Sequence, residues 1–149
     1  MTARLLYCLS RFFGRSPGLP ESDVRTILVV RRNRMGDMIC TVPLLHALRA
    51  RYPEARIVVA CDREGQPIAR ASGCADEVIV IPPIRNKFLL AMRAQSFLPR
   101  ADIAIGVRVG FDKYLGALIL ASGAARRIGF GTPDPAGMFY TDCVPPPAE

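Results

Sequence analysis

The chain alternates short apolar runs, rich in valine and isoleucine, with stretches of helical periodicity. The apolar runs are residues 26–30 (TILVV), 56–61, 77–81, 102–107 and, more weakly, 127–130. The helical stretches between them are residues 37–51, 64–71, 86–97 and 113–121. Continuous apolar runs joined by helices are typical of strands buried on both faces of a parallel sheet. We therefore predict an α/β fold, a Rossmann-like parallel sheet with helices on both faces.

The chain has 149 residues, which is the size of one ordinary domain. We divide it into a basic amphipathic helix at residues 1–20, a Rossmann-like domain at 24–131 and a Pro/Gly-rich linker or tail at 132–149. The arginines of residues 1–20 share one helical face, while the leucines and phenylalanines share the other. Such a helix either packs on the domain or attaches to an anionic membrane surface, and both interpretations stay open.

Composition excludes several classes of protein. Half of the residues are hydrophobic and 22% are charged, and no apolar run approaches the roughly 18–20 residues of a membrane span. The formal charge of +7 favours anionic partners. We do not predict nucleic-acid binding, because aromatic residues make up only 7% and no binding-module signature is present. Five cysteines without CxxC spacing and one histidine indicate neither a disulfide framework nor a zinc site, which favours a reducing cytoplasm.

The segment RNRMGD follows the first predicted strand, at the edge where a parallel sheet binds its ligands. It matches neither GxGxxG nor the P-loop pattern, so a nucleotide-binding module is the weaker interpretation. Gly36 can allow close backbone approach or a positive φ, which leaves Asp37 at the N-cap or in the first turn of a helix. Asp37 is then either a capping residue or a reacting carboxylate, and its position alone does not decide between them.

Arginines gather in the loops at this predicted edge. Arg31, Arg32 and Arg34 follow the first strand, and Arg108 follows the fourth. Because the carboxyl ends of parallel strands meet at one edge, we expect these four side chains to face whatever binds there. Guanidinium groups are suited to phosphate and carboxylate ligands.

Two further side chains lie on the helix predicted to begin at Asp37. Thr41 comes four residues later, on the same helical face, where it can help to orient a hydroxyl group. His46 comes nine residues later and would lie on the opposite face of a regular helix, which argues against a dyad with Asp37. We expect His46 to be a surface or packing residue.

Three segments, in the same order, resemble the bacterial lipopolysaccharide heptosyltransferases of glycosyltransferase family 9. ILVVRRNRMGDMICTVPLLHALRARYPEARIVVAC resembles the family's first strand, Gly-Asp corner and Thr-x-Pro-Leu helix. CADEVIVI resembles its Asp-Glu-Val strand, and SGAARRIGF its Ser-Gly-Ala segment ending in Arg-Ile-Gly-Phe. The resemblance covers roughly residues 26–146.

The resemblance implies the N-terminal half of a GT-B glycosyltransferase, in which two Rossmann-like domains face each other across a cleft. The first domain binds the sugar acceptor, and Asp37 would act as general base on its hydroxyl. Gly36, Thr41, Arg31, Arg32, Arg34 and Arg108 would bind an anionic lipopolysaccharide core or lipid A acceptor. The segment IGVRVGFDK lacks the acidic and His-like polar residues of relatives, which weakens the assignment of Arg108.

The resemblance implies no cofactor, because the ADP-sugar is a co-substrate bound mainly by a second domain. That domain is absent from this chain, so we expect a truncated product or one chain of a split enzyme, inactive or nearly so alone. A second chain would supply the donor domain. We expect a cytoplasmic protein, peripheral on the inner face of the inner membrane if the N-terminal helix binds lipid. The alternative is a non-catalytic remnant that acts as a binding or interaction domain.

Overall fold

The computed structural model describes residues 20, 23–32, 35–84, 86–108, 110, 112–130 and 137–144. The strands are β1 (Thr26–Arg31), β2 (Arg56–Cys61), β3 (Glu77–Val80), β4 (Ile103–Gly106), β5 (Arg126–Phe130) and β6 (Asp142–Val144). The helices are α2 (Met35–Ile39), α3 (Val42–Arg51), α4 (Gln66–Ala71), α5 (Lys87–Phe97) and α6 (Lys113–Ala121), with a short 3₁₀ helix, η2 (Arg63–Gly65), before α4.

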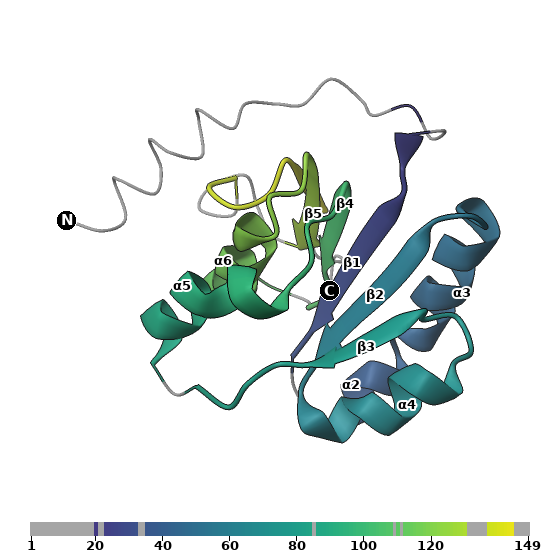
Figure 1. Ribbon diagram of the computed structural model, residues 1–149, viewed down its shortest axis with the longest axis horizontal. Helices are drawn as coiled ribbons and strands as arrows, with labels where there is room; N and C mark the ends of the chain where they lie inside the picture. The colour runs from purple at the N-terminus through teal and green to yellow at the C-terminus, as the bar shows by residue number, and fades with distance from the viewer. Residues whose placement is uncertain are drawn as a thin grey trace.

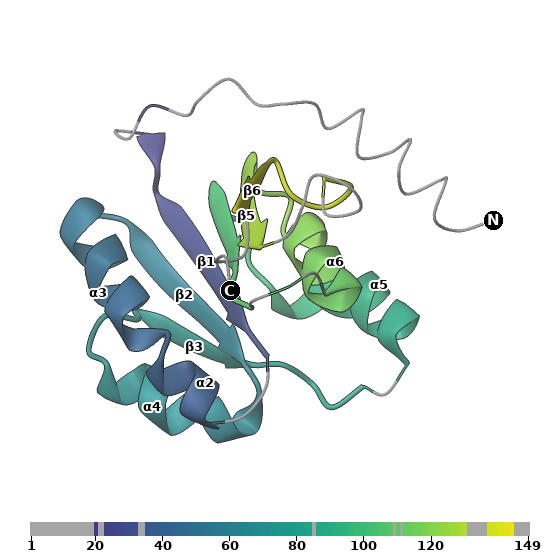
Figure 2. The ribbon, with the colours of Figure 1, turned by 180° about the vertical axis from the view of Figure 1, so that it is seen from behind.

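The strands form one parallel sheet in the order β3-β2-β1-β4-β5-β6. The chain therefore builds outward from β1 through β2 and β3, and then crosses to the other side of β1 to build β4, β5 and β6. The strand order reverses between β1 and β4. Helices α2, α3 and α4 cover one face of the sheet, and α5 and α6 cover the other (Figures 1 and 2). This arrangement confirms the predicted fold class.

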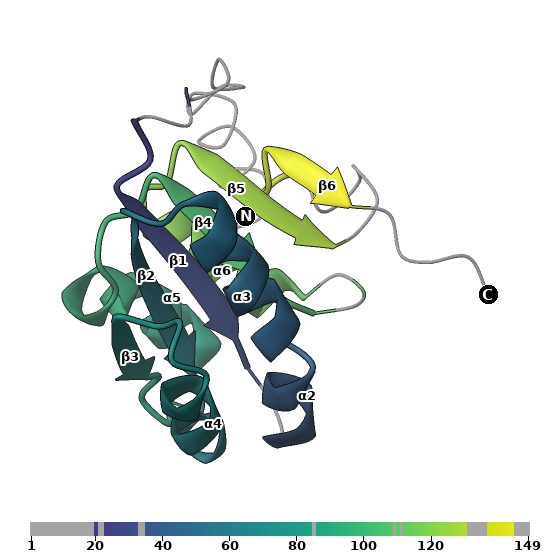
Figure 3. The ribbon, with the colours of Figure 1, turned by 90° about the vertical axis from the view of Figure 1, so that its right-hand side faces the viewer.

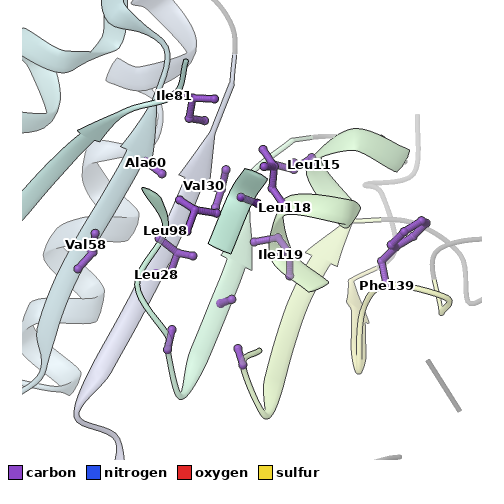
Figure 4. Packing of buried hydrophobic residues seen from close by; sticks show 14 of the residues in the cluster. Leu28, Val30, Val58, Ala60, Ile81, Leu98, Leu115, Leu118, Ile119 and Phe139 are labelled. Atoms are coloured by element: carbon purple, nitrogen blue, oxygen red, sulfur yellow. The ribbon is translucent and has the colours of Figure 1, made fainter. Parts of the chain in front are cut away.

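Strand β1 supplies both halves of the core. Residues Ile27, Leu28, Val29 and Val30 are fully buried, and successive side chains point to opposite faces. Leu28 and Val30 pack towards α6 (Figure 4), while Ile27 and Val29 join the cluster under α2 and α3. Burying each such side chain stabilises the fold by about 1.5–3 kcal/mol.

The predicted helix at residues 37–51 is wrong in one respect, because the structure divides it. Helix α2 ends at Ile39, Cys40 and Thr41 form a turn, and α3 begins at Val42 with a proline in its first turn. Pro43 has no N–H and cannot bond to the carbonyl of Ile39, which explains the break.

The prediction that the chain beyond residue 131 is a linker or tail is also wrong for residues 137–144. They return to the sheet, and their last three residues form β6 along the outer edge of β5 (Figure 3). Phe139 and Tyr140 are buried in the core. The predicted N-terminal helix lies outside the described residues, apart from Pro20 at its last position.

The two aromatic rings of this segment occupy space that only glycine leaves. A Cβ atom on Gly116 would lie 2.7 Å from Cγ of Phe139, and one on Gly129 would overlap the ring of Tyr140. Arg127 also holds this segment, donating from Nε to the carbonyl of Phe139 (2.8 Å). Burial lowers the pKa of this guanidinium. Residues 137–144 are therefore part of the folded unit.

Gly129→Ala should lower the free energy of unfolding by about 1–3 kcal/mol, because the added methyl group overpacks the ring of Tyr140. Urea unfolding followed by circular dichroism measures this change. Gly36→Ala is the matched control, since its Cβ would meet no atom within 4 Å and its site is helical. Equal stability of the Gly129 variant and the parent chain would contradict this packing.

At the amino end of the strands, Arg49 and Asp76 join α3 to the turns before β2 and β3. The Arg49 guanidinium donates to the Cys74 carbonyl (3.0 Å) and to the Asp76 carboxylate (2.5 Å), which also accepts from the Ile57 N–H (2.7 Å). Partial burial raises the pKa of Asp76, but the hydrogen bonds from Ile57 and Arg49 outweigh it and bring this pKa below its usual value.

Because the folded-state pKa of Asp76 is lowered, its contribution to stability is complete above the unfolded-state pKa of about 4 and is lost as the pH falls below it. Asp76→Asn should therefore be less stable than the parent chain at pH 7, and the difference should shrink towards pH 3. Chemical denaturation across this range measures it, with the exposed Glu54→Gln as control. A difference that is constant with pH would contradict the assignment.

Candidate functional site

The candidate site lies at the sheet edge formed by the carboxyl ends of β1 and β4, which we call the switch edge. Open parallel sheets bind ligands in the crevice at such a reversal of strand order. Strand β1 ends there at Arg31, whose side chain is 11% exposed. Its Nη1 donates to the carbonyl of Val107, just after β4, and its Nη2 lies 3.0 Å from Oδ1 of Asp37. One guanidinium therefore connects β1, the loop after β4 and α2.

Asp37 is the third residue of α2, in its first turn. Its side chain is 42% exposed, and Oδ1 is held by Arg31. Among the residues that the structure describes, Oδ2 has no partner, and the carboxylate accepts no backbone N–H. Within the described residues, the carboxylate is therefore fixed through Oδ1, and Oδ2 is left open.

Gly36 and Thr41 support the backbone around Asp37. Thr41 is 1% exposed, and its hydroxyl donates to the carbonyl of Asp37 (2.9 Å), so it stabilises the junction of α2 and α3 and does not face a ligand. Gly36 is helical, and the positive φ considered for it from the sequence is wrong. The space at its Cβ position is open, which leaves room for the close approach that was the other expectation.

The described arginines at this edge form ion pairs with carboxylates. Arg32 Nε lies 3.7 Å from Oδ1 of Asp62, directly after β2. Arg108 pairs with Asp112, which also caps α6 by accepting from the Tyr114 N–H (2.8 Å). Arg34 lies outside the described residues. The structure thus brings Arg31 to Asp37, while Arg32 and Arg108 each contact a different carboxylate.

His46 lies far from Asp37, near the amino end of the strands. It is exposed, as expected, and its Nδ1 lies 3.2 Å from Sγ of Cys74.

Burial and the nearby Asp62 raise the pKa of the Cys61 thiol to about 11, so Cys61 is not a nucleophile at neutral pH. No cluster of three or more His, Cys, Asp or Glu side chains that could hold a metal ion occurs in the described part of the chain.

A hollow of about 750 Å³ opens beside the switch edge, over the carboxyl ends of β2 and β3. Arg32, Asp62 and Arg63 contribute to its lining, whereas Asp37 does not. The sequence analysis missed Asp62 and Asp112 as partners of the arginines. One signal was available, because Asp62 directly follows a predicted strand and Asp112 directly precedes a predicted helix.

Comparison with known proteins supports the fold. No family model matches the chain, and no curated protein has a significantly similar sequence. A solved glycosyl transferase family 9 protein from Veillonella parvula superposes with a TM-score of 0.67 at 19% sequence identity. The match covers 87% of this chain and 37% of that protein. This chain has the fold of part of a family 9 glycosyltransferase. At 19% sequence identity, the match shows a similar fold and nothing further.

Within the described ranges, none of the helices combines the length and the apolar character needed to cross a bilayer. The proposed attachment of residues 1–20 to a membrane surface lies outside those ranges.

Arg31→Ala should lower the free energy of unfolding by about 1–3 kcal/mol, because it removes charged hydrogen bonds that join β1 to Val107 and Asp37. Arg108→Ala is the control at the same edge. Its ion pair is 44% exposed on the arginine side, so its loss should cost at most about 1 kcal/mol. Urea unfolding measures both, and equal costs would contradict the bridging role of Arg31.

Proposed function

We propose that the chain is the acceptor-binding half of a glycosyltransferase of lipopolysaccharide core biosynthesis. Together with a donor domain, it would transfer a heptose from ADP-heptose to a hydroxyl of a core sugar. The observation that carries the proposal is the Asp37 carboxylate, which Arg31 fixes at the switch edge through Oδ1 while the side chain stays 42% exposed. The likeness of fold to a family 9 glycosyltransferase supports it.

Glycosyl transfer requires two events at the acceptor half. The acceptor oxygen must attack the anomeric carbon as the bond from that carbon to the ADP oxygen breaks, and its proton must go to a base. Asp37 takes this proton through its open oxygen, a contribution of about 10²- to 10⁴-fold to the rate. Arg31 is then a positioning residue, because its Nη1 and Nη2 atoms contact Val107 and Asp37 and it acts on the reaction through the carboxylate.

The anionic acceptor is bound by the remaining cations of this edge. Arg32 and Arg108 each pair with a carboxylate in the absence of ligand, and a phosphate would compete for those guanidinium groups. No cofactor enters the proposed reaction, since the ADP-sugar is consumed as co-substrate. The proposed site of action is the cytoplasmic side of the inner membrane, where residues 1–20 would attach peripherally.

The same pairing of charges favours a second candidate. A surface on which Arg31, Arg32 and Arg108 are each matched by a carboxylate is also what a non-catalytic interaction domain would present. On this interpretation Asp37 is a structural partner of Arg31, and the chain binds without turnover.

Asp37→Asn should reduce transfer at least about 100-fold, because the amide keeps the shape of the carboxylate but cannot accept the proton. The assay combines the full chain with a separately produced family 9 donor domain, ADP-heptose and a lipopolysaccharide core acceptor, and follows ADP release. Asp142→Asn is the matched control, since that carboxylate is 43% exposed and pairs with Arg126 at the far edge of the sheet.

If the Asp37 variant keeps the full rate, Asp37 is not the base and is only a structural partner of Arg31. If the parent chain releases no ADP with the donor domain present, yet binds the core acceptor, the interaction-domain function is correct. Binding of the acceptor by calorimetry separates these outcomes from a chain that does not recognise the acceptor.

A further inference from the structure

The hollow beside the switch edge has the size of a small-molecule site. Its volume of about 750 Å³ falls in the range of roughly 300–1,000 Å³ typical of ligand pockets. It lies where β1, β2 and β3 end, between the segment after β3 and the start of α4, a region that can be located in Figure 1. Asp37 does not line it, so it is a place separate from the proposed base.

One wall of the hollow is apolar and fixed. It consists of Val80 at the end of β3, followed by Ile81 and Pro83. Ile81 is 3% exposed, and its N–H donates to the carbonyl of Cys61 (2.8 Å), which continues the pairing of β2 and β3 beyond the last residue of the strand. The wall is therefore preformed, and it suits the C–H face of a small ring.

The opposite side of the hollow is polar and carries charges of both signs. Asp62 and Arg32 form the ion pair at 3.7 Å, and Arg32 Nε is buried with no hydrogen-bond acceptor among the described residues. Arg63 and Glu64 in η2 are exposed, and in the described part of the chain their side chains have no partner. Gln66 completes this side. The side chains present acceptors for hydroxyl groups next to donors for an anion.

Such a lining is suited to a ligand that carries both hydroxyl groups and an anionic group. Carboxylate and amide oxygens of Asp62, Glu64 and Gln66 can accept from neighbouring hydroxyls, while the guanidinium groups of Arg63 and Arg32 can bind a phosphate or carboxylate. An acidic residue directly after β2 is also where dinucleotide-binding sheets of this strand order hold a ribose diol.

We propose that this hollow is a binding site for a sugar ring that carries a vicinal diol and an anionic group. Two sources share that chemistry, a ribonucleotide and an acidic sugar of a glycan. The site shares Arg32 with the proposed acceptor surface, and it goes beyond the proposed transfer reaction because binding here requires neither Asp37 nor a donor domain.

The test titrates the full ¹⁵N-labelled chain with AMP, with glucuronic acid, and with inorganic phosphate and glucose as controls, and follows backbone amide shifts by NMR. AMP or glucuronic acid should give saturable shifts at residues 63–66 and 80–81, on both sides of the hollow. A response to AMP identifies the ribonucleotide as the source, and a response to glucuronic acid identifies the glycan. 2′,3′-Dideoxy-AMP should bind less tightly than AMP because it lacks the diol.

Arg63→Gln should weaken this binding about tenfold or more, because it removes the exposed guanidinium that meets the anion. Arg70→Gln is the matched control, since Arg70 is exposed at the end of α4 and does not line the hollow. Both variants change exposed side chains, and their amide spectra report directly that they are folded. The proposal would be overturned if inorganic phosphate gave the same amide shifts as AMP or glucuronic acid. It would also be overturned if the Arg63 and Arg70 variants lost the same affinity, or if neither ligand saturated the shifts by about 10 mM.

Discussion

Strand β1 is the element on which the rest of the structure depends. Four successive residues, Ile27 to Val30, are fully buried, and the strand is hydrogen-bonded in parallel to β2 on one side and to β4 on the other. Because the chain leaves β1 in one direction and returns on its other side, the strand ends at the point where the sheet order reverses. Whatever follows β1 in the sequence is thereby placed at the crevice of the sheet.

The first residue at that crevice, Arg31, is mostly buried and connects neighbouring elements. Arg31 places its charge between a backbone carbonyl and Asp37, and these partners come from different elements. A guanidinium in this position makes the open oxygen of Asp37 a fixed point relative to both central strands. Preorganisation of this kind is what the proposed general base needs.

The sequence was sufficient for the first five strands of the sheet and for the place of Asp37, because both follow from local signals. Buried parallel strands appear as continuous apolar runs, and a Gly-Asp corner after the first run lies at the carboxyl edge. Strand β6 was missed because it has only three residues, Asp142–Val144, without an apolar run of its own. What holds that strand is the burial of Phe139 and Tyr140, which depends on glycines far away in the sequence.

The roles of the arginines could not be predicted in the same way. The carbonyl that Arg31 contacts is 76 residues away and comes next to it only because β4, and not β3, pairs with β1. Whether a guanidinium faces solvent or spans two strands is therefore a property of strand order. Arg32 depends likewise on the neighbouring β2, whose end supplies Asp62. A sequence pattern predicts that these arginines lie at the carboxyl edge of the sheet, but it does not predict which groups they contact.

The fit between the glycines and the aromatic rings links positions that are distant in the chain. Gly116 and Phe139 share one volume of space, as do Gly129 and Tyr140. A change at either member leaves a clash or a void unless the other changes as well. Among natural relatives of this chain, these pairs should consequently vary together, with a larger residue at a glycine position accompanied by a smaller one in the returning segment.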